Sequence, residues 1–165
     1  MRLTNTVAVT ATALFVLVAC GNDREMETYL SAALPILQSH GDVTESTNAA
    51  NVSVSRAAAT GNRDQIIGAI TTYRNEIDRA VARIEVEIGM WRGLTVPKGA
   101  REIHLEVLDA LLKEIEGLQG LSSSYSATLA GAQLPPEIVN DANERLKEAF
   151  VVYTGMQQRL AALSD

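Results

Sequence analysis

Residues that commonly bind metal ions or form disulfides are scarce in this sequence, which contains one cysteine and two histidines among 165 residues. A disulfide within the chain is therefore excluded, and so is a structural zinc site, which takes four Cys or His ligands. Lysine and arginine number 14 against 20 aspartates and glutamates, for a formal net charge of -6. This acidic balance, with no basic cluster, argues against a nucleic-acid-binding protein.

Motifs of the common catalytic and nucleotide-binding sites are also absent. The sequence has no Gly-x-Ser-x-Gly elbow, no Gly-x-Gly-x-x-Gly and no Walker loop. The Glu-x-x-His motif of di-iron bundles is missing too, because Leu37 and Arg101 stand three residues before the two histidines, His40 and His104. We therefore expect no enzymatic activity and no bound cofactor.

The first residues of the chain differ in composition from the rest. Arg2 is followed by an apolar run over 7–18 that only two threonines interrupt. The run is about a dozen residues long, whereas a helix that spans a membrane needs roughly 20. The layout is typical of a secretory signal peptide, which we expect to cover residues 1–19.

Residues 17–20, Leu-Val-Ala-Cys, directly follow the apolar run and resemble the lipobox of bacterial lipoproteins. The resemblance implies that diacylglycerol is attached to Cys20 and that the precursor is cut after Ala19. Because Gly21 rather than aspartate follows the cysteine, the family's sorting rule would permit export to the outer membrane in a cell with two membranes. The alternative is an ordinary signal peptide or membrane helix with a chance cysteine.

We expect the implied mature chain, residues 20–165, to be a single domain, which its lipid anchor holds on the extracytoplasmic side of the membrane. Each buried CH₂ group of an acyl chain adds about 0.8 kcal/mol, so two or more chains give stable attachment. Only a few residues separate Cys20 from the first expected helix, and the domain should therefore sit against the membrane.

Apolar residues recur at steps of three and four from residue 62 onward, which predicts helices over 62–92, 97–130 and 135–163. Asn62, with Gln65 three residues later, is expected to cap the first of these helices. In the second helix, Gly117 and Gly120 are expected to weaken the middle of the helix and to bend it.

An N-terminal helix is expected over 23–58, with a candidate break near residue 41. Beyond the break the chain is rich in Ser, Thr, Asn and Ala, so that 41–60 fits either a weakly packed helix or a partial loop. Short connections make consecutive helices antiparallel. The expected fold is therefore all-α, an up-and-down antiparallel four-helix bundle with long helices.

The two histidines lie on apolar stripes of different helices. If the turns fall near residues 61 and 94, His104 lies at the same height along the bundle axis as residue 84, and His40 lies at a similar height. A facing pair could bind haem or a transition metal, or change charge between pH 6 and 7. The alternative is a core histidine at 104 and a helix-end histidine at 40, beside Gly41.

The segment 91–94, Trp-Arg-Gly-Leu, followed by Pro97 and His104, resembles a helical junction of all-helical bacterial lipoproteins without an assigned activity. The resemblance implies no chemistry, but it suggests that the membrane-near end is a contact surface. We expect a non-enzymatic envelope lipoprotein that binds another envelope protein or acts as a structural accessory. The alternative is a helical-bundle module that binds a small ligand, haem or a metal.

Overall fold

The computed structural model describes residues 24–132 and 136–163, in which every regular element is a helix. The elements are α1 (Arg24–Thr60), α2 (Arg63–Arg92), the short 3-10 helix η1 (Lys98–Ala100), α3 (Arg101–Leu129) and α4 (Pro136–Ala162). The predicted all-α fold is thus confirmed. The expected signal peptide, its cleavage site at Ala19 and Cys20 lie outside the described residues, and none of the described helices has the length and apolarity to cross a membrane.

The start of α2 confirms the predicted cap. The Asn62 side chain accepts hydrogen bonds from the backbone N–H groups of Asp64 at 3.0 Å and Gln65 at 3.1 Å. Gly61, with φ +66°, provides the left-handed conformation that ends α1. The predicted start of the next helix at residue 97 is too early, because Pro97 precedes η1 and α3 itself begins at Arg101.

α1 is one uninterrupted helix, so the candidate break near residue 41 does not occur and 41–60 is helical. Gly41 is exposed and lies in open space. Beyond it, the hydroxyls of Thr44, Thr47 and Ser53 donate hydrogen bonds to carbonyls four residues earlier. Polar side chains that bond back to their own helix are compatible with helical backbone. The polar composition of this segment therefore produces an exposed helix instead of a loop.

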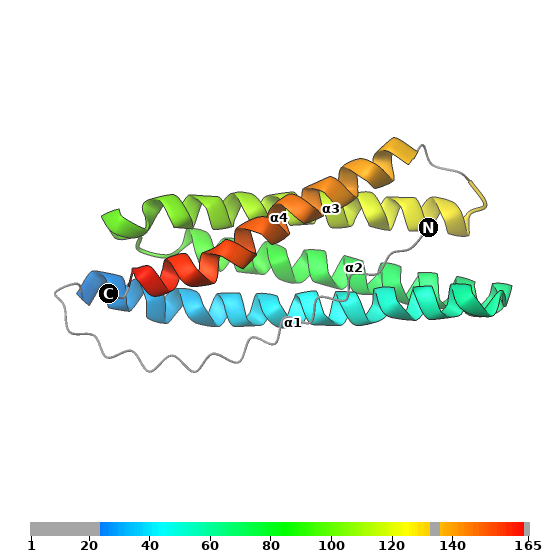
Figure 1. Ribbon diagram of the computed structural model, residues 1–165, viewed down its shortest axis with the longest axis horizontal. Helices are drawn as coiled ribbons and strands as arrows, with labels where there is room; N and C mark the ends of the chain where they lie inside the picture. Colours follow the sequence, from blue (N-terminus) through cyan, green and yellow to red (C-terminus); the bar gives the residue numbers. More distant parts are fainter. Residues whose placement is uncertain (1–23, 133–135, 164–165) are drawn as a thin grey trace.

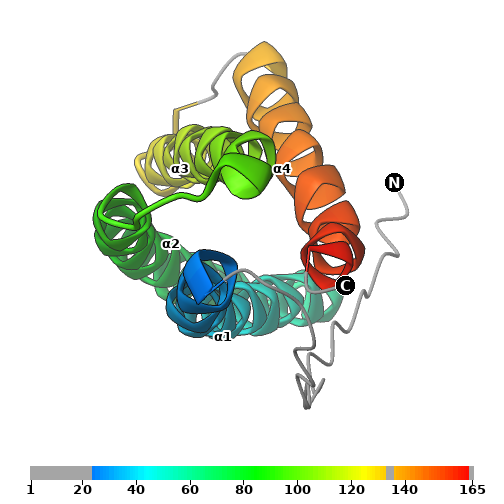
Figure 2. The ribbon, with the colours of Figure 1, turned by 90° about the vertical axis from the view of Figure 1, so that its left-hand side faces the viewer.

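Consecutive helices lie side by side and run in opposite directions (Figure 1). Extensive contacts join α1 with α2, α2 with α3, and α3 with α4. α4 crosses α3 obliquely, so that its C-terminal half comes beside α1 while its N-terminal half leans away from it (Figures 1 and 2). At the end of the bundle where α1 meets α2, α4 therefore stands apart from α1 (Figures 1 and 2).

The crossing of α3 and α4 depends on two glycines. A Cβ atom on Gly117 would lie 2.8 Å from the carbonyl oxygen of Ala142, and one on Gly120 would lie 2.9 Å from the Cβ of the same alanine. Both distances are too short for a real contact. Gly117 and Gly120 thus let the two helix backbones approach closely at this point, which determines the direction in which α4 leaves α3.

Burial divides the bundle into two parts. We call the part near η1 the closed half and the part near the α1–α2 turn the open half. The closed half comprises 24–43, 84–118 and 149–163, and the open half comprises 44–83, 119–132 and 136–148. Six of the seven largest fully buried side chains belong to the closed half: Trp91, Tyr29, Ile84, Leu111, Val43 and Val107. The seventh, Ile77, belongs to the open half.

Candidate functional site

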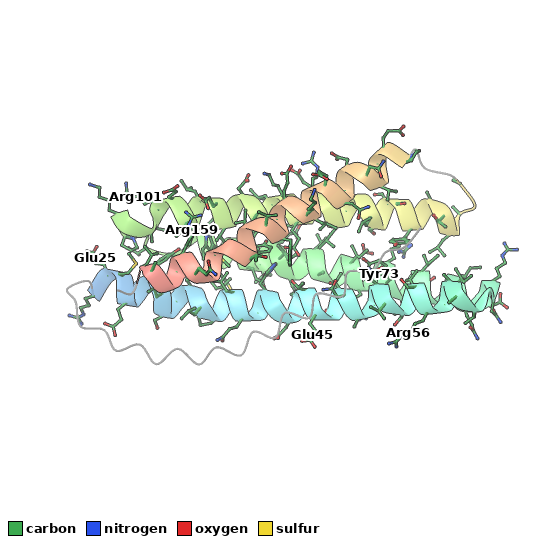
Figure 3. All side chains as sticks on the ribbon, viewed as in Figure 1. Glu25, Glu45, Arg56, Tyr73, Arg101 and Arg159 are labelled. Carbon is green, nitrogen blue, oxygen red and sulfur yellow. The ribbon has the colours of Figure 1, made fainter. Side chains whose placement is uncertain are left out.

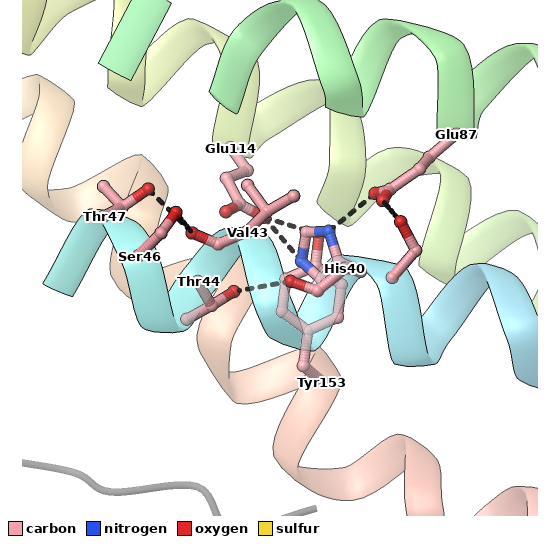
Figure 4. Close-up of polar contacts among 9 residues, drawn as sticks. His40, Val43, Thr44, Ser46, Thr47, Glu87, Glu114 and Tyr153 are labelled. Carbon is pink, nitrogen blue, oxygen red and sulfur yellow. Dashed lines mark hydrogen bonds and ion pairs between the residues drawn. The ribbon is translucent and has the colours of Figure 1, made fainter. Parts of the chain in front are cut away.

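Four polar side chains, one from each long helix, meet inside the closed half (Figure 4). They are His40 of α1, Glu87 of α2, Glu114 of α3 and Tyr153 of α4, which we call the His40 network. The histidine and the two glutamates are at most 8% exposed. Buried ionisable groups are rare unless they are paired, so the contacts of this cluster define the candidate site.

His40 lies between the two carboxylates. Its Nδ1 is 3.0 Å from Oε2 of Glu87, and its Nε2 is 3.1 Å from Oε2 of Glu114. The first contact is a hydrogen bond, whereas the second has a poor hydrogen-bond angle and is an ion pair by distance. The imidazole ring also packs against the ring of Tyr153, with centroids 4.7 Å apart at 54°.

Two hydroxyl groups donate hydrogen bonds to the carboxylates of the network. Ser39 donates a hydrogen bond to Oε1 of Glu87 at 2.8 Å, and the phenol of Tyr153 donates one to Oε2 of Glu114 at 2.9 Å. One imidazolium faces two carboxylates, so the cluster carries an excess negative charge when all three groups are ionised. The hydroxyl donors stabilise that charge in a buried environment that water does not reach freely.

The surroundings favour a charged His40. Burial by itself lowers the pKa of His40, but the two adjacent carboxylates, Glu114 and Glu87, outweigh it and raise that pKa to about 9. Burial, together with the charge and hydrogen bond of Glu114, also raises the pKa of Tyr153, which therefore stays a neutral donor. At neutral pH the site is a protonated histidine held between two acids.

His104 occupies a different environment. Its ring stacks on Trp91, with centroids 5.2 Å apart at 14°, and its Nδ1 is 3.4 Å from the hydroxyl of Tyr29. The indole N–H of Trp91 donates to the backbone carbonyl of His104 at 3.0 Å. Burial lowers the pKa of His104, so the neutral ring is favoured. The residue forms part of an aromatic cluster near the end of the bundle.

The structure does not bring the two histidines together, so the prediction that they lie at a similar height along the bundle is wrong. His104 contacts Tyr29, about three turns before His40 in α1, and His40 contacts Glu114, about three turns after His104 in α3. Their separation along the bundle is therefore about 15 Å. The error arises at the connection between α2 and α3, which occupies residues 93–100 and places His104 beside Trp91.

The His40 network is arranged for charge pairing. The two nitrogens of the imidazole face carboxylates on different sides of the ring, so His40, Glu87 and Glu114 do not converge on one point. In the described part of the chain, no group of three His, Cys, Asp or Glu side chains is placed to hold a metal ion. What the geometry supports is a proton held at His40 and a polar link between four helices.

Sequence reasoning missed both glutamates of the network. Glu87 stands on the apolar stripe of α2 next to Ile88, and Glu114 lies between Leu111 and Leu118 at helical spacing. A carboxylate at a core position is an available signal, because it needs a buried partner. The identity of that partner depends on the register between helices. Comparisons with protein-family models, with curated proteins and with solved structures gave no match.

Proposed function

We propose that the mature chain is an extracytoplasmic lipoprotein, anchored to membrane lipid through Cys20 after removal of residues 1–19. The outer membrane is its expected location in a cell with two membranes. The observation that carries the proposal is the Leu-Val-Ala-Cys sequence at 17–20, directly after an apolar run too short to span a bilayer. The folded part, an up-and-down bundle of four long helices, begins at Arg24, close to the anchor.

We further propose that the bundle is a non-enzymatic accessory that binds another envelope protein. The surface of α4 supports this role, since Phe150 is 41% and Val151 63% exposed. Val151 borders a shallow pocket of about 270 Å³ whose other lining residues are Lys113, Glu144, Lys147 and Glu148. Exposed apolar side chains surrounded by charged ones are typical of protein-binding surfaces.

The anchor is tested by metabolic labelling with a fatty-acid analogue. The chain is expected to become labelled, and globomycin is expected to cause the uncut precursor to accumulate. A Cys20→Ala variant should lose the label, because the thiol is the site of attachment. A variant that remains labelled would refute the lipoprotein assignment.

Partner binding is tested with a photo-crosslinking residue at Val151 in cells. We expect a discrete adduct with one envelope protein. The matched control is Val52, an exposed apolar residue of the open half. If the same adducts form from both positions, or none forms from Val151, this surface of α4 does not bind a specific protein.

A small-ligand module is the second candidate. Its support is an open groove of about 810 Å³ between α2 and α3, lined by Asp78, Val81, Ala82, Glu85, Gln119, Ser122, Ser123 and Ser126. Hydroxyl, amide and carboxylate groups of this kind fit a polar organic molecule. A ligand that raises the melting temperature of the protein, but not that of a Ser123→Leu variant, would favour this function. Metal by elemental analysis, or a Soret band with added haem, would favour the haem or metal alternative at His40 or His104.

A further inference from the structure

The connection between α2 and α3 is positively charged, in contrast to the rest of this acidic chain. Between residues 88 and 101 the only charged side chains are Arg92, Lys98 and Arg101, while the whole chain has a net charge of -6. All three are exposed. None of them takes part in the ion pairs formed among residues 24–132 and 136–163. Their charges are therefore available to an external anion.

This connection lies at the end of the bundle where α1 begins. Figure 3 shows Arg101 and Glu25 at the same end, with Arg56 at the opposite one. A Cβ atom on Gly99 would be 3.3 Å from the Cε of Met26, so η1 packs directly on the first turns of α1. Cys20 stands four residues before Arg24, and four Cα steps of about 3.8 Å reach at most about 15 Å.

Apolar side chains accompany the three cations. Met90, in the last turn of α2, is 53% exposed, and Leu105, at the start of α3, is 63% exposed. The acidic side chains of the same end are Glu25 and Glu27 in the first turn of α1 and Glu102 at the start of α3, which lies 3.9 Å from Arg159. Exposed apolar groups beside unpaired Lys and Arg fit the interface of an anionic membrane, where apolar groups enter the headgroup region and cations meet lipid phosphates.

We propose that this surface, the basic end formed by Met90, Arg92, Lys98, Arg101 and Leu105, rests on anionic phospholipid headgroups. The bundle then stands with the α2–α3 connection against the membrane and the open half away from it. The inference rests on the lipid anchor proposed above, because a tether at Cys20 holds this end within reach of the bilayer. An acyl anchor and a basic surface are two signals that reinforce each other.

The test measures the distance of each end from the membrane in the full lipidated protein, reconstituted in vesicles of phosphatidylcholine and phosphatidylglycerol with acceptor dye on the headgroups. Lipidation consumes the natural cysteine, so one donor dye is placed on a Thr95→Cys or an Ala59→Cys variant. α2 has 30 residues and is about 45 Å long, which separates the two positions well. We expect strong energy transfer from position 95 and weak transfer from position 59.

Charge reversal tests the role of the cations. The double variant Lys98→Glu with Arg101→Glu should lower the energy transfer from position 95. Each lost cation is expected to lower about fivefold the ratio of bundles that rest on the membrane to bundles that do not. Arg56→Glu with Arg63→Glu, the same change of charge at the opposite end, should leave it unchanged. In vesicles of phosphatidylcholine alone, the protein without charge reversal should show the same decrease in energy transfer.

Two outcomes would overturn the inference, and they differ in what else they imply. Equal transfer from positions 95 and 59, or equal effects of the two double variants, in a protein that floats with vesicles would overturn the basic end alone and leave the anchor standing. A chain that takes up no fatty-acid label and does not float with vesicles would overturn the proposed function and the basic end together.

Discussion

The closed and open halves of the bundle have the same secondary structure but very different cores. In α1 the seven buried residues all lie between Met26 and Val43, whereas none of residues 44–60 is buried, although the helix continues to Thr60. Backbone hydrogen bonds and hydroxyl groups that bond back to the helix satisfy the polar groups of the exposed part. The comparison teaches that helix continuity and tertiary stabilisation are separate properties, because burial supplies most of the stability of helices in proteins.

The difference follows from the side chains available in each half. Residues 44–60 contain Val52 and Val54 as their only large apolar residues. The direction of α4, fixed at Gly117 and Gly120, also removes a partner from this part of α1. The closed half has large apolar side chains from four helices together with the His40 network. We therefore expect the open half to have lower local stability, with free energies of opening well below that of global unfolding.

The largest effect is expected from removal of the cation in the closed half. A His40→Leu variant leaves Glu87 and Glu114 buried without a positive partner, which should lower the free energy of unfolding by about 3–5 kcal/mol in urea titrations followed by circular dichroism. The control is a His40→Leu variant that also carries Glu87→Gln and Glu114→Gln, and it should recover much of that loss. A loss below about 1 kcal/mol in the single variant would show that the network does not stabilise the closed half.

The second prediction is a pH dependence that arises in the same half. A histidine whose pKa is raised in the folded protein stabilises it while protonated, so the contribution of His40 is complete below its unfolded pKa of about 6.5. It decreases as the pH rises and is lost above the folded pKa of about 9. Over this window we expect a loss of about 3 kcal/mol in the free energy of unfolding.

The pH prediction has an internal control in the other histidine. Burial lowers the pKa of His104, so its contribution is lost as the pH falls below about 6.5, outside the window of His40. Urea titrations between pH 6.5 and 9 should therefore report His40, and His40→Leu should flatten that slope. An unchanged slope in the variant would assign the pH dependence to other groups.

The parts of the fold that sequence predicted are those governed by local periodicity. The helices after residue 62 and the cap at Asn62 follow from side chains within one or two turns of each other. The partners of His40 do not, because Glu87 and Glu114 meet it only through the registers of α1 with α2 and α3. A connection a few residues longer than assumed is enough to change every pairing in height between helices.

The glycines of α3 show the same limit of local reasoning. From sequence, Gly117 and Gly120 are expected only to weaken and bend their own helix. In the structure they are the points at which α4 crosses α3, and this role depends on Ala142 and Leu146 of another helix. Their effect on the shape of the bundle is a tertiary property that no spacing within α3 reveals.

The third prediction tests the crossing that separates the two halves. Gly117→Ala would place a Cβ atom 2.7 Å from Cγ of Leu146 and 2.8 Å from the carbonyl oxygen of Ala142, so α4 must shift. We expect a loss of about 1–3 kcal/mol in the free energy of unfolding. Gly155→Ala on α4 is the control, because its new methyl group would meet nothing within 4 Å. If the two variants are equally stable, the close crossing at Gly117 is not the cause of the open half.

The fourth prediction, with a smaller expected effect, compares an isoleucine-to-valine substitution in the two halves of α2. Ile84 in the closed half is 0% exposed, and Ile67 in the open half is 41% exposed. Ile84→Val should lower the free energy of unfolding by about 0.5–1.5 kcal/mol, because the lost methylene leaves a cavity. Ile67→Val should change it by less than about 0.5 kcal/mol. If Ile84→Val and Ile67→Val lower the free energy of unfolding equally in thermal and urea titrations, the two halves are packed alike.

The smallest expected effect distinguishes a bundle that unfolds as one unit from one whose open half unfolds first. Gly68 lies in α2 within the open half, and a Cβ atom there would meet nothing within 4 Å. Gly68→Ala should therefore stabilise helical backbone by about 0.5–1 kcal/mol. If the open half unfolds by itself, native-state hydrogen exchange should slow in 44–83, while the closed half exchanges as before. If one transition joins both halves, the slowest-exchanging amides near Ile84 should gain the same free energy, and the division into two halves would describe packing without independent unfolding.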